Sequence, residues 1–593
     1  MPEKRRSYQA RLSALRKEMK KEKRDGYILP RTDEFQSEFL APYAERLKWL
    51  TGFTGSAGVS IVLDYKAVVM SDGRYTIQLK DQVDTKLFET DDMMKTSIGD
   101  WLAENAEFGT VIGYDVWLMT IDQVAKIKEK VAHKNIALKP TEGNLIDRIW
   151  VDHPQWPSKK ATVFPDDIAG RTSREKRKSI SKELKAKGCS ACLVTQGDSI
   201  AWVLNIRGAD VPYTPVCLSY LLLHEDGSAE WFVDGDKLTP DVARALGHTV
   251  KVHNFYNLEK RMSEVNGKLW IDPKTAPSWF GMIAQKNKID VYEAEDPCVK
   301  PKSIKTIEEQ KASRFVHILD GVAVTRFLKW VDDHQNKISK SELAAEGALD
   351  GFRRASDKYI GPSFETIAGF ADHGAIVHYR ATMQSNKIIK GDGLLLVDSG
   401  AQYKWGTTDI TRTVAIGTPT EEMRENYTRV LKGHIAVASA VFESDTTGKE
   451  IDALARAPLR KEGLDYAHGT GHGVGCYLGV HEKATHISPK EDNTFEVGML
   501  LSNEPGYYKE GEYGIRIENL VLVRDAQKSG CYRFDTISFA PFDPSLIVDS
   551  LLTKSEKEWL KTYEQNIADF VMPRLSQEEQ AWLKTKLTFI ETR

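Results

Sequence analysis

Cysteine is scarce in this chain. Its 593 residues include six, at positions 189, 192, 217, 298, 476 and 531. Domains that depend on disulfides are dense in cysteine, so this scarcity excludes a disulfide scaffold and favours a reducing compartment. Cys189 and Cys192 have the CxxC spacing, but no second pair and no histidine pair follows at zinc-finger distance. We expect two thiols beside a buried strand.

Long apolar runs and an excess of one charge are also missing. The longest apolar stretches, LSYLLL and GLLLV, fall far short of the roughly 18 residues that span a bilayer. The 82 basic and 85 acidic residues give a net charge of −3, so no global field favours nucleic acid or an anionic membrane. The first residues are charged throughout, unlike a signal peptide. We expect a soluble, cytoplasmic protein that binds neither nucleic acid nor a membrane.

The chain does contain enough apolar matter for several cores. Hydrophobic residues make up 41% of the 593, and this length predicts three to five domains of about 100 to 200 residues each. A weak internal repeat predicts that the first two domains are related α/β units. Each has a basic helix, a short strand, a Trp-containing stretch with glycine, hairpin-like strands and an Asp-Gly turn, over residues 8–73 and 173–235.

A third unit begins with a long helix. Ser303 is the expected N-cap, with Glu308 and Glu309 in the early turns, and apolar residues recur at helical spacing as far as Val331. From residue 364 to about 524 the pattern changes to short strands with Gly-rich turns. Seven of the fourteen histidines lie within residues 373–486, which places the chemistry in this unit.

Three segments of the third unit supply acidic and imidazole groups. LLLVDSGAQYKWGTTDITRT (394–413) predicts a hairpin that carries Asp398 and Asp409. HGTGHGVG (468–475) presents His468 and His472 among small residues, and residues 501–523 hold Glu504 and Glu518. Arg516 shares the Glu518 face of an alternating strand, where it either orients a carboxylate or forms a plain surface ion pair. Any one of these acids, taken alone, is compatible with a solvent-exposed hairpin that binds no metal. Together, four carboxylates match two divalent ions, and an oxygen-rich set with one histidine suits Mn, Co or Fe(II).

These motifs resemble a known family. DSG followed by TTDITRT, HGTGHGVG, LSNEPGYY and GIRIEN are similar to the motifs of the pita-bread metallopeptidases, and within them of the long, three-domain cytosolic Xaa-Pro aminopeptidases. QSEFLAPYAERLKWLTGFTGSAG (36–58), SDGRY (71–75) and DSIAWVLNIRGADVPYTPV (198–216) resemble the two N-terminal domains of that long form. The resemblance covers nearly the whole chain.

The resemblance implies an α/β fold with two creatinase-like domains, residues 1–150 and 151–304. A pita-bread catalytic domain then covers 305–593, with its core at 305–525 and a helical C-terminal extension at 526–593. It implies removal of the first residue from peptides with proline second, by a dinuclear metal centre and a metal-bridging hydroxide. The cofactors would be two divalent ions, with Mn(II) favoured over Co, Fe or Zn, and the family forms homodimers through the catalytic domain.

The resemblance also assigns the site. The implied metal ligands are Asp398, Asp409, His472, Glu504 and Glu518, and the implied catalytic residues are His378, His468, His481 and Glu504. The chain departs from the family pattern at Lys483-Ala484, where Gly-Pro is usual, and at His373, where Asn is common. Both departures adjoin the expected substrate pocket.

Other functions stay open beside this one. A prolidase, which cuts only Xaa-Pro dipeptides, would use the same five ligands, although the two extra N-terminal domains favour the aminopeptidase. A creatinase-type hydrolase without metals is disfavoured because every ligand is present. A pita-bread protein that has lost its metals and acts in binding is disfavoured for the same reason.

Overall fold

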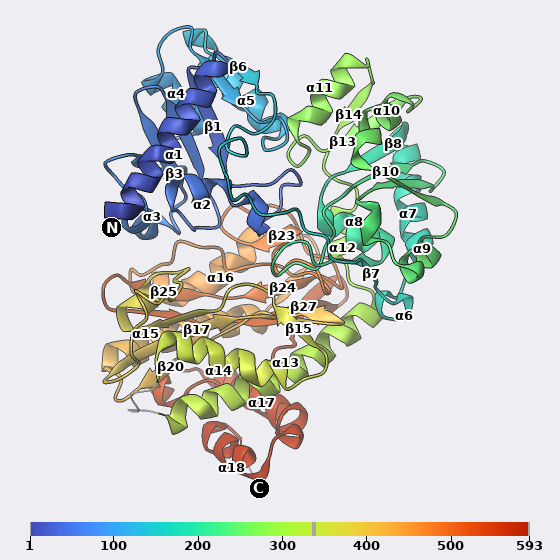
Figure 1. Ribbon diagram of the computed structural model, residues 1–593. Coiled ribbons are helices and arrows are strands. Elements are labelled where there is room, and N and C mark those ends of the chain that lie inside the picture. The colour runs from blue at the N-terminus through green and yellow to red at the C-terminus, as the bar shows by residue number, and fades with distance from the viewer. Residues whose placement is uncertain (1, 335–339, 591–593) are drawn as a thin grey trace. The chain divides into compact units, whose positions relative to one another are not determined.

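The computed structural model describes residues 2–334 and 340–590, which form two compact units (Figure 1). The first unit comprises Met1–Phe164 and Thr172–Cys298, and the second comprises Pro165–Arg171 and Val299–Arg593. Within the described residues, no helix is both long and apolar enough to cross a membrane.

The first unit contains two six-stranded sheets with the same topology. One has the order β4-β3-β2-β1-β5-β6 and the other β12-β11-β10-β8-β13-β14, so each strand of one has a counterpart in the other. In both, the first strand in sequence pairs antiparallel with the second and parallel with the fifth. The internal repeat predicted from the sequence is therefore a repeat of the fold.

The strands of the first sheet are β1 (Gly26–Pro30), β2 (Val59–Leu63), β3 (Ala67–Ser71), β4 (Glu89–Asp92), β5 (Val111–Tyr114) and β6 (Ala137–Pro140). Those of the second are β8 (Cys189–Val194), β10 (Tyr220–His224), β11 (Ala229–Phe232), β12 (Val250–His253), β13 (Lys268–Ile271) and β14 (Val291–Glu293). The main helices around them are α1 (Pro2–Lys21), α4 (Ile98–Asn105), α5 (Ile121–Val131), α7 (Ser173–Ala186), α8 (Gly197–Leu204), α10 (Leu258–Ser263) and α11 (Ser278–Lys286).

The CxxC pair lies in the central strand of the second sheet. Cys189 and Cys192 are both in β8, and both are buried free thiols. Burial raises the pKa of the Cys192 thiol well above its usual value, because the surrounding apolar matter disfavours the thiolate. The expectation of two structural thiols is confirmed.

The second unit is built on short antiparallel strands between helices. Its strands are β15 (Tyr359–Pro362), β16 (Ile367–Phe370), β17 (Gly393–Ser399), β18 (Ala401–Tyr403), β19 (Gly406–Thr407), β20 (Ile410–Ile416), β21 (Val441–Glu443), β22 (Gly471–Gly473), β23 (Glu482–Ile487), β24 (Leu500–Asn503), β25 (Gly506–Lys509), β26 (Tyr513–Arg516), β27 (Asn519–Asp525) and β28 (Cys531–Thr536). Its helices are α12 (Val299–Ser303), α13 (Ile307–Asp333), α14 (Glu342–Arg354), α15 (Glu421–Ala438), α16 (Gly448–Arg460), α17 (Lys554–Phe570) and α18 (Gln577–Lys586).

Helices cover the strands of the second unit with apolar faces. Phe327 and Leu328 of α13 share a buried cluster with Leu349 of α14 and with residues of β16, β17 and β20. Figure 1 shows α13 and α14 running along these strands, with α17 and α18 beyond α13. On the other side, α15 and α16 share a cluster with β24, β27 and β28. This packing fixes the strand ends that carry the acidic residues.

The long helix begins later than expected. Ser303 ends α12, and the N-cap of α13 is Thr306, whose side chain accepts from the Glu309 amide while the Glu309 carboxylate accepts from the Thr306 amide. The prediction of Ser303 as the cap is wrong because Thr306-x-x-Glu309 forms a reciprocal capping box, which satisfies two helix-end groups at once.

The helical tail packs as expected. Trp559 of α17 stacks on Tyr563 with ring centroids 5.2 Å apart, and Trp582 of α18 donates from its indole N–H to Asp332 at 2.9 Å. Both tryptophans lie against the large apolar cluster of the second unit. The tail is therefore part of the core of this unit.

Candidate metal centre

A hairpin carries the first two carboxylates. Strands β17 and β20 pair antiparallel with Asp398 opposite Thr411, and Asp409 lies one residue before β20. Between them, Tyr403 pairs with Gly406 in the tight turn that the sequence predicts. Because the strands are antiparallel, this register brings the end of one next to the start of the other. Asp398 and Asp409 are therefore held at the same end of the hairpin, both buried.

His472 lies in β22 between two glycines that the packing requires. A Cβ at Gly471 would come 2.0 Å from the Ser502 carbonyl oxygen, and one at Gly473 would come 2.7 Å from the Glu482 carbonyl oxygen. The Nδ1 of His472 lies 2.9 Å from the Gly473 carbonyl oxygen, which fixes the tautomer with the proton on Nδ1. Its Nε2 faces Glu504 at 3.4 Å and Asp409 at 3.6 Å. Burial lowers the pKa of His472 well below its usual value, so the imidazole is neutral, as a metal ligand must be.

Glu504 and Glu518 complete the group from two further segments. Glu504 follows β24 and accepts a hydrogen bond from the Ser502 hydroxyl at 3.1 Å. Glu518 lies between β26 and β27 and accepts from the Thr411 hydroxyl at 2.7 Å. Ligand atoms of Asp409, His472 and Glu518 all lie within 4.8 Å of one another. Segments that are far apart in the sequence thus bring their candidate ligand atoms together.

The burial and mutual repulsion of these carboxylates favour bound cations. Burial raises the pKa of Asp409 well above its usual value, and the charges of Asp398 and Glu504 add to the shift. Burial likewise raises the pKa of Glu518, and raises that of Glu504 to about 7. The buried Oδ1 of Asp398 has no hydrogen-bond partner among the described residues. A buried acceptor without a donor, beside carboxylates that repel one another, fits divalent ions bound at this place.

Arg516 orients one of the carboxylates. Its Nη2 lies 2.7 Å from the Asp398 Oδ2, and both side chains are buried. The alternative of a surface ion pair is therefore wrong. The guanidinium holds Asp398 through Oδ2, which leaves Oδ1 directed elsewhere. Arg516 Nη2 also donates to the Val377 carbonyl oxygen at 3.3 Å, so the backbone next to His378 is tied to the same guanidinium.

Tyr508, which no sequence pattern singled out, links this pair to His468. The Tyr508 hydroxyl accepts from Arg516 Nη1 at 2.5 Å and lies 2.8 Å from His468 Nε2. His468 Nδ1 faces the Gly469 carbonyl oxygen at 2.7 Å, so Nδ1 carries the proton and Nε2 accepts from Tyr508. Burial and the charge of Arg516 lower the pKa of His468 to about 3. His468 is therefore a neutral, fully hydrogen-bonded residue at the end of a chain that leads to Asp398.

We expect Tyr508→Phe to lower kcat/KM for a peptide substrate by roughly 10- to 100-fold, the usual effect of removing a group that orients a ligand. The phenyl ring keeps the packing but breaks the hydrogen bonds to both His468 and Arg516. Steady-state kinetics at saturating metal measures the effect. The control is Tyr507→Phe, because Tyr507 precedes it on β25 and packs against Tyr513 instead. Equal rates for the two variants would show that the chain through Tyr508 does not matter.

The remaining histidines divide into two groups. The His481 ring lies 4.4 Å from the His472 ring, beside the candidate ligands, and His378 follows the Val377 carbonyl that Arg516 binds. By contrast, His373 contacts the buried Glu342 at 2.8 Å, and His434 is buried between the Asn503 carbonyl and the Asn519 side chain. Both of these rings are therefore tied to neighbouring groups of the protein.

A buried ion cluster fixes the strand that follows His481. Glu482, the first residue of β23, accepts from Lys302 at 3.1 Å and also from Lys305. All three side chains are buried. Removing one partner of such a cluster leaves an uncompensated charge, which costs about 3–5 kcal/mol. The cluster therefore holds the position of His481, and the sequence did not reveal it because its partners are 180 residues apart.

Known proteins match this chain over its whole length. Residues 311–525 match the model of metallopeptidase family M24, and residues 11–149 and 152–309 match models of the creatinase/prolidase N-terminal domain. Residues 530–590 match the C-terminal region of peptidase M24. A probable Xaa-Pro aminopeptidase P of Paracoccidioides brasiliensis is 36% identical, over 97% of this chain and 98% of that protein. The chain belongs to the Xaa-Pro aminopeptidase P family.

Further relatives and solved structures are similar to this chain. A probable Xaa-Pro aminopeptidase P of Neosartorya fischeri is 36% identical, over 94% of this chain and 89% of that protein. The crystal structure of X-prolyl aminopeptidase from Caenorhabditis elegans, described as a cytosolic enzyme with a di-nuclear active site, superposes with a TM-score of 0.92. It is 31% identical and covers 98% of this chain and 100% of that one. A prolidase from Pyrococcus horikoshii, 23% identical with a TM-score of 0.51 over 62% of this chain and 99% of that one, shares the fold.

Proposed function

We propose that this protein is a metalloaminopeptidase that removes the first residue from peptides with proline in the second position. The observation that carries the proposal is the meeting of Asp398, Asp409, His472, Glu504 and Glu518, which we assign as the ligands of two divalent ions. Full-length similarity to Xaa-Pro aminopeptidases P supports the substrate class. The intact set of acids disfavours a binding protein without catalysis.

Two divalent ions bound there would generate a nucleophile from water at neutral pH and polarise the scissile carbonyl. The chain supplies the proton transfers. Glu504 Oε1, which faces the Ser502 hydroxyl at 3.1 Å, is our choice for the group that carries a proton to the leaving nitrogen. We assign His378 to binding the carbonyl and His481, whose ring lies 4.4 Å from that of His472, to the proline side, and we assign His468 to orienting Tyr508. General acid help of this kind contributes roughly 10²- to 10⁴-fold.

Proline explains the need for a dedicated site. Its nitrogen carries no hydrogen and its ring fixes φ, so the scissile bond fits poorly in a site that binds an N–H at this position. The leaving nitrogen must also gain a proton as the bond breaks, which gives Glu504 its role. We assign the recognition of the pyrrolidine ring to the histidines near the candidate ligands.

Finer assignments are proposals of the same kind. Oxygen-rich ligands with one imidazole favour Mn(II). We infer a cytoplasmic enzyme, by analogy with the cytosolic enzyme of Caenorhabditis elegans, and a homodimer formed through the catalytic domain. We also propose domain boundaries at 150/151 and 304/305, with an extension from 526. The matched family regions meet near these positions.

The substrate class can be tested directly with the full-length protein and Mn(II). We expect cleavage of an Xaa-Pro-Pro tripeptide at its first bond, and little cleavage of the same tripeptide with alanine in second place. Mass spectrometry of the products identifies the bond. Cleavage of an Xaa-Pro dipeptide alone would make the protein a prolidase. No cleavage with Mn, Co, Fe or Zn would support the binding-protein alternative.

A further inference from the structure

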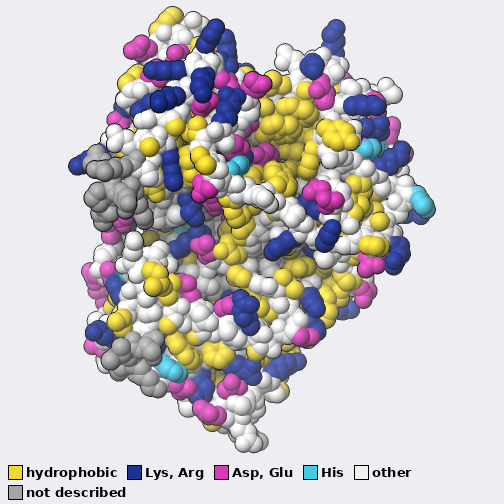
Figure 2. All heavy atoms as spheres, viewed as in Figure 1, with side chains coloured by type: hydrophobic (Ala, Val, Ile, Leu, Met, Phe, Trp, Pro, Cys, Tyr) yellow, Lys and Arg dark blue, Asp and Glu magenta, His cyan; other side chains and the backbone are white. Residues whose placement is uncertain are grey.

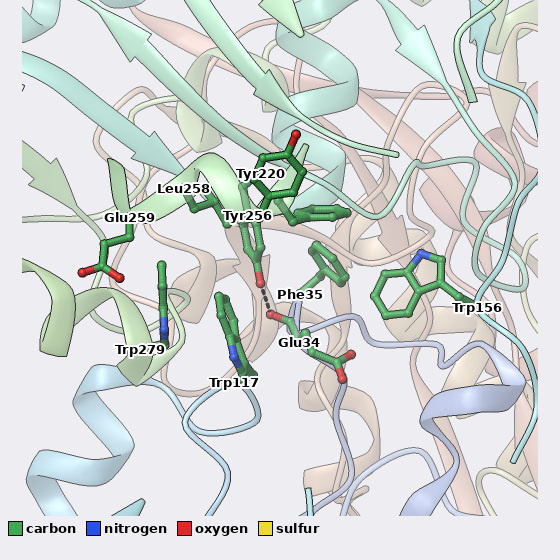
Figure 3. A pocket seen from close by; sticks show the side chains of 10 residues that line it. Glu34, Phe35, Trp117, Trp156, Tyr220, Tyr256, Leu258, Glu259 and Trp279 are labelled. Carbon is green, nitrogen blue, oxygen red and sulfur yellow. Dashed lines mark hydrogen bonds between the residues drawn. The ribbon is translucent and has the colours of Figure 1, made fainter. Parts of the chain in front are cut away.

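The first unit contains a pocket that none of the candidate metal ligands lines. Figure 2 shows apolar side chains gathered in a hollow of the first unit, near α5 and α11. The pocket has a volume of about 450 Å³, within the range of small-molecule sites. Its walls are mainly aromatic, formed by Phe35, Trp117, Trp156, Tyr220, Phe255 and Trp279 (Figure 3).

The pocket lies where the topology of both sheets favours a ligand. Phe35 follows β1 and Trp117 follows β5, and these strands are parallel. In the second sheet Trp279 follows β13, and Tyr220 opens β10, next to the end of the parallel strand β8. Ligands of open α/β sheets bind beyond the carboxyl ends of the strands, where the strand order reverses. Here two such edges face one another within one unit.

The aromatic walls are held in place before any ligand arrives. The Trp117 and Trp279 rings stack at 4.5 Å, and the Trp279 amide donates to the Val116 carbonyl oxygen at 3.1 Å. Tyr220 stacks on Phe35 at 4.8 Å, and its hydroxyl donates to the Glu34 carbonyl oxygen at 2.5 Å (Figure 3). Trp156, by contrast, is 38% exposed, so the pocket opens to solvent. A preformed aromatic site costs little ordering when it binds.

The charged side chains that line this pocket are acidic. The charged side chains among its described lining residues are Glu34 and Glu259, and none of those residues is basic. Glu34 accepts from Arg46 at 2.8 Å, but Arg46 is shared with Asp147. Glu259 contacts Lys286 at 2.6 Å in an exposed pair, which water screens.

The acidic groups near the pocket affect the pKa of Tyr220 in its wall. Burial raises the pKa of Tyr220 well above its usual value, and the charges of Glu34, Asp33 and Asp115 add to the shift. No cation is among the causes of this shift. Burial also raises the pKa of Asp33 to about 6, with Glu34 as the next contribution. Acidic groups therefore lie close behind this wall of the pocket.

We propose that the aromatic pocket of the first unit binds a small organic cation of the alkylated ammonium class. The faces of tryptophan and tyrosine rings attract such a cation through their quadrupole, and alkyl groups on the nitrogen lower its cost of desolvation. Glu34 and Glu259 supply the counter-charge from the pocket edge. The residues are separate from the candidate metal ligands, so the proposal stands whatever the second unit hydrolyses.

Choline and its uncharged isostere 3,3-dimethyl-1-butanol test the proposal on the full-length protein. The two have nearly the same shape and differ in charge. We expect saturation-transfer NMR to show saturable binding of choline, and binding of the isostere at least about tenfold weaker. Equal binding of the two would show a merely apolar pocket and overturn the proposal. So would the absence of saturable choline binding up to about 50 mM, well above the millimolar range of weak sites.

Variants locate the site. Trp279→Ala is expected to weaken choline binding about tenfold and Trp279→Phe less, because a ring face remains. Glu259→Gln is expected to weaken it about threefold. The matched controls are Phe108→Ala and Glu107→Gln, at exposed residues of the same unit outside the pocket. Circular dichroism checks that each variant folds. Unchanged binding in all three pocket variants, or equal losses in the controls, would place the cation elsewhere and refute the assignment.

Discussion

Replacing Asp409 with asparagine is expected to lower kcat/KM for an Xaa-Pro-Pro tripeptide by at least about 10³-fold. The loss of one ligand would remove several kcal/mol of transition-state stabilisation from a two-metal site. Asparagine has nearly the same shape as aspartate, so the hairpin of β17 and β20 stays intact. Initial rates over a range of metal concentrations separate weaker metal binding from slower turnover.

The thermal stability of Asp409→Asn without metal provides a second test. Burial and the charges of Asp398 and Glu504 raise the pKa of Asp409, so a neutral side chain relieves repulsion in the metal-free protein. We expect its thermal midpoint without metal to be unchanged or higher than that of the natural chain. The control is Asp525→Asn, at an exposed position at the end of β27, which should leave both activity and stability unchanged. Retained activity in Asp409→Asn would contradict the ligand assignment.

Metal removal is expected to have the next largest effect. Chelation should abolish peptidase activity, and Mn(II) should restore it. Bound metal stabilises the folded state by mass action, by about 4 kcal/mol at a thousandfold excess over Kd. Denaturant unfolding with chelator and with Mn(II) measures the difference. Activity that survives full removal of metal, verified by elemental analysis, would contradict the two-metal proposal.

The stability of the metal-free protein should also depend on pH in a defined direction. The pKa of Glu504 is raised from its ordinary 4.5 to about 7, chiefly by burial. The folded state therefore holds a proton that the unfolded state has released, and stability falls as pH rises from about 4.5 to about 7. Metal replaces that proton, so the stabilisation by Mn(II) should be larger at pH 8 than at pH 5. Equal stabilisation at both values would show that the carboxylates are not its ligands.

Much of the fold could be read from local patterns. The repeat of helix, strand and Asp-Gly turn predicted two related domains, and their sheets have the same strand order. The apolar run that ends at Asp398, followed by a turn near residues 404–406, predicted the hairpin. Such patterns succeed because side-chain periodicity and turn chemistry act over a few residues. The predicted N-cap of α13 was wrong for a local reason, because the reciprocal hydrogen bonds of Thr306 and Glu309 start the helix three residues after Ser303.

The sequence by itself determined which residues are candidate ligands, because their acids and histidine lie in motifs that resemble those of a known family. Only the tertiary structure decided how they are held. The chain from His468 through Tyr508 spans 40 residues, and the pair of Lys302 with Glu482 spans 180. The stacked Trp117 and Trp279 lie in the loop after β5 and in α11 after β13, which belong to two different sheets. Periodicity describes one element at a time, whereas a hydrogen bond or a stacked ring depends on which elements the core brings together.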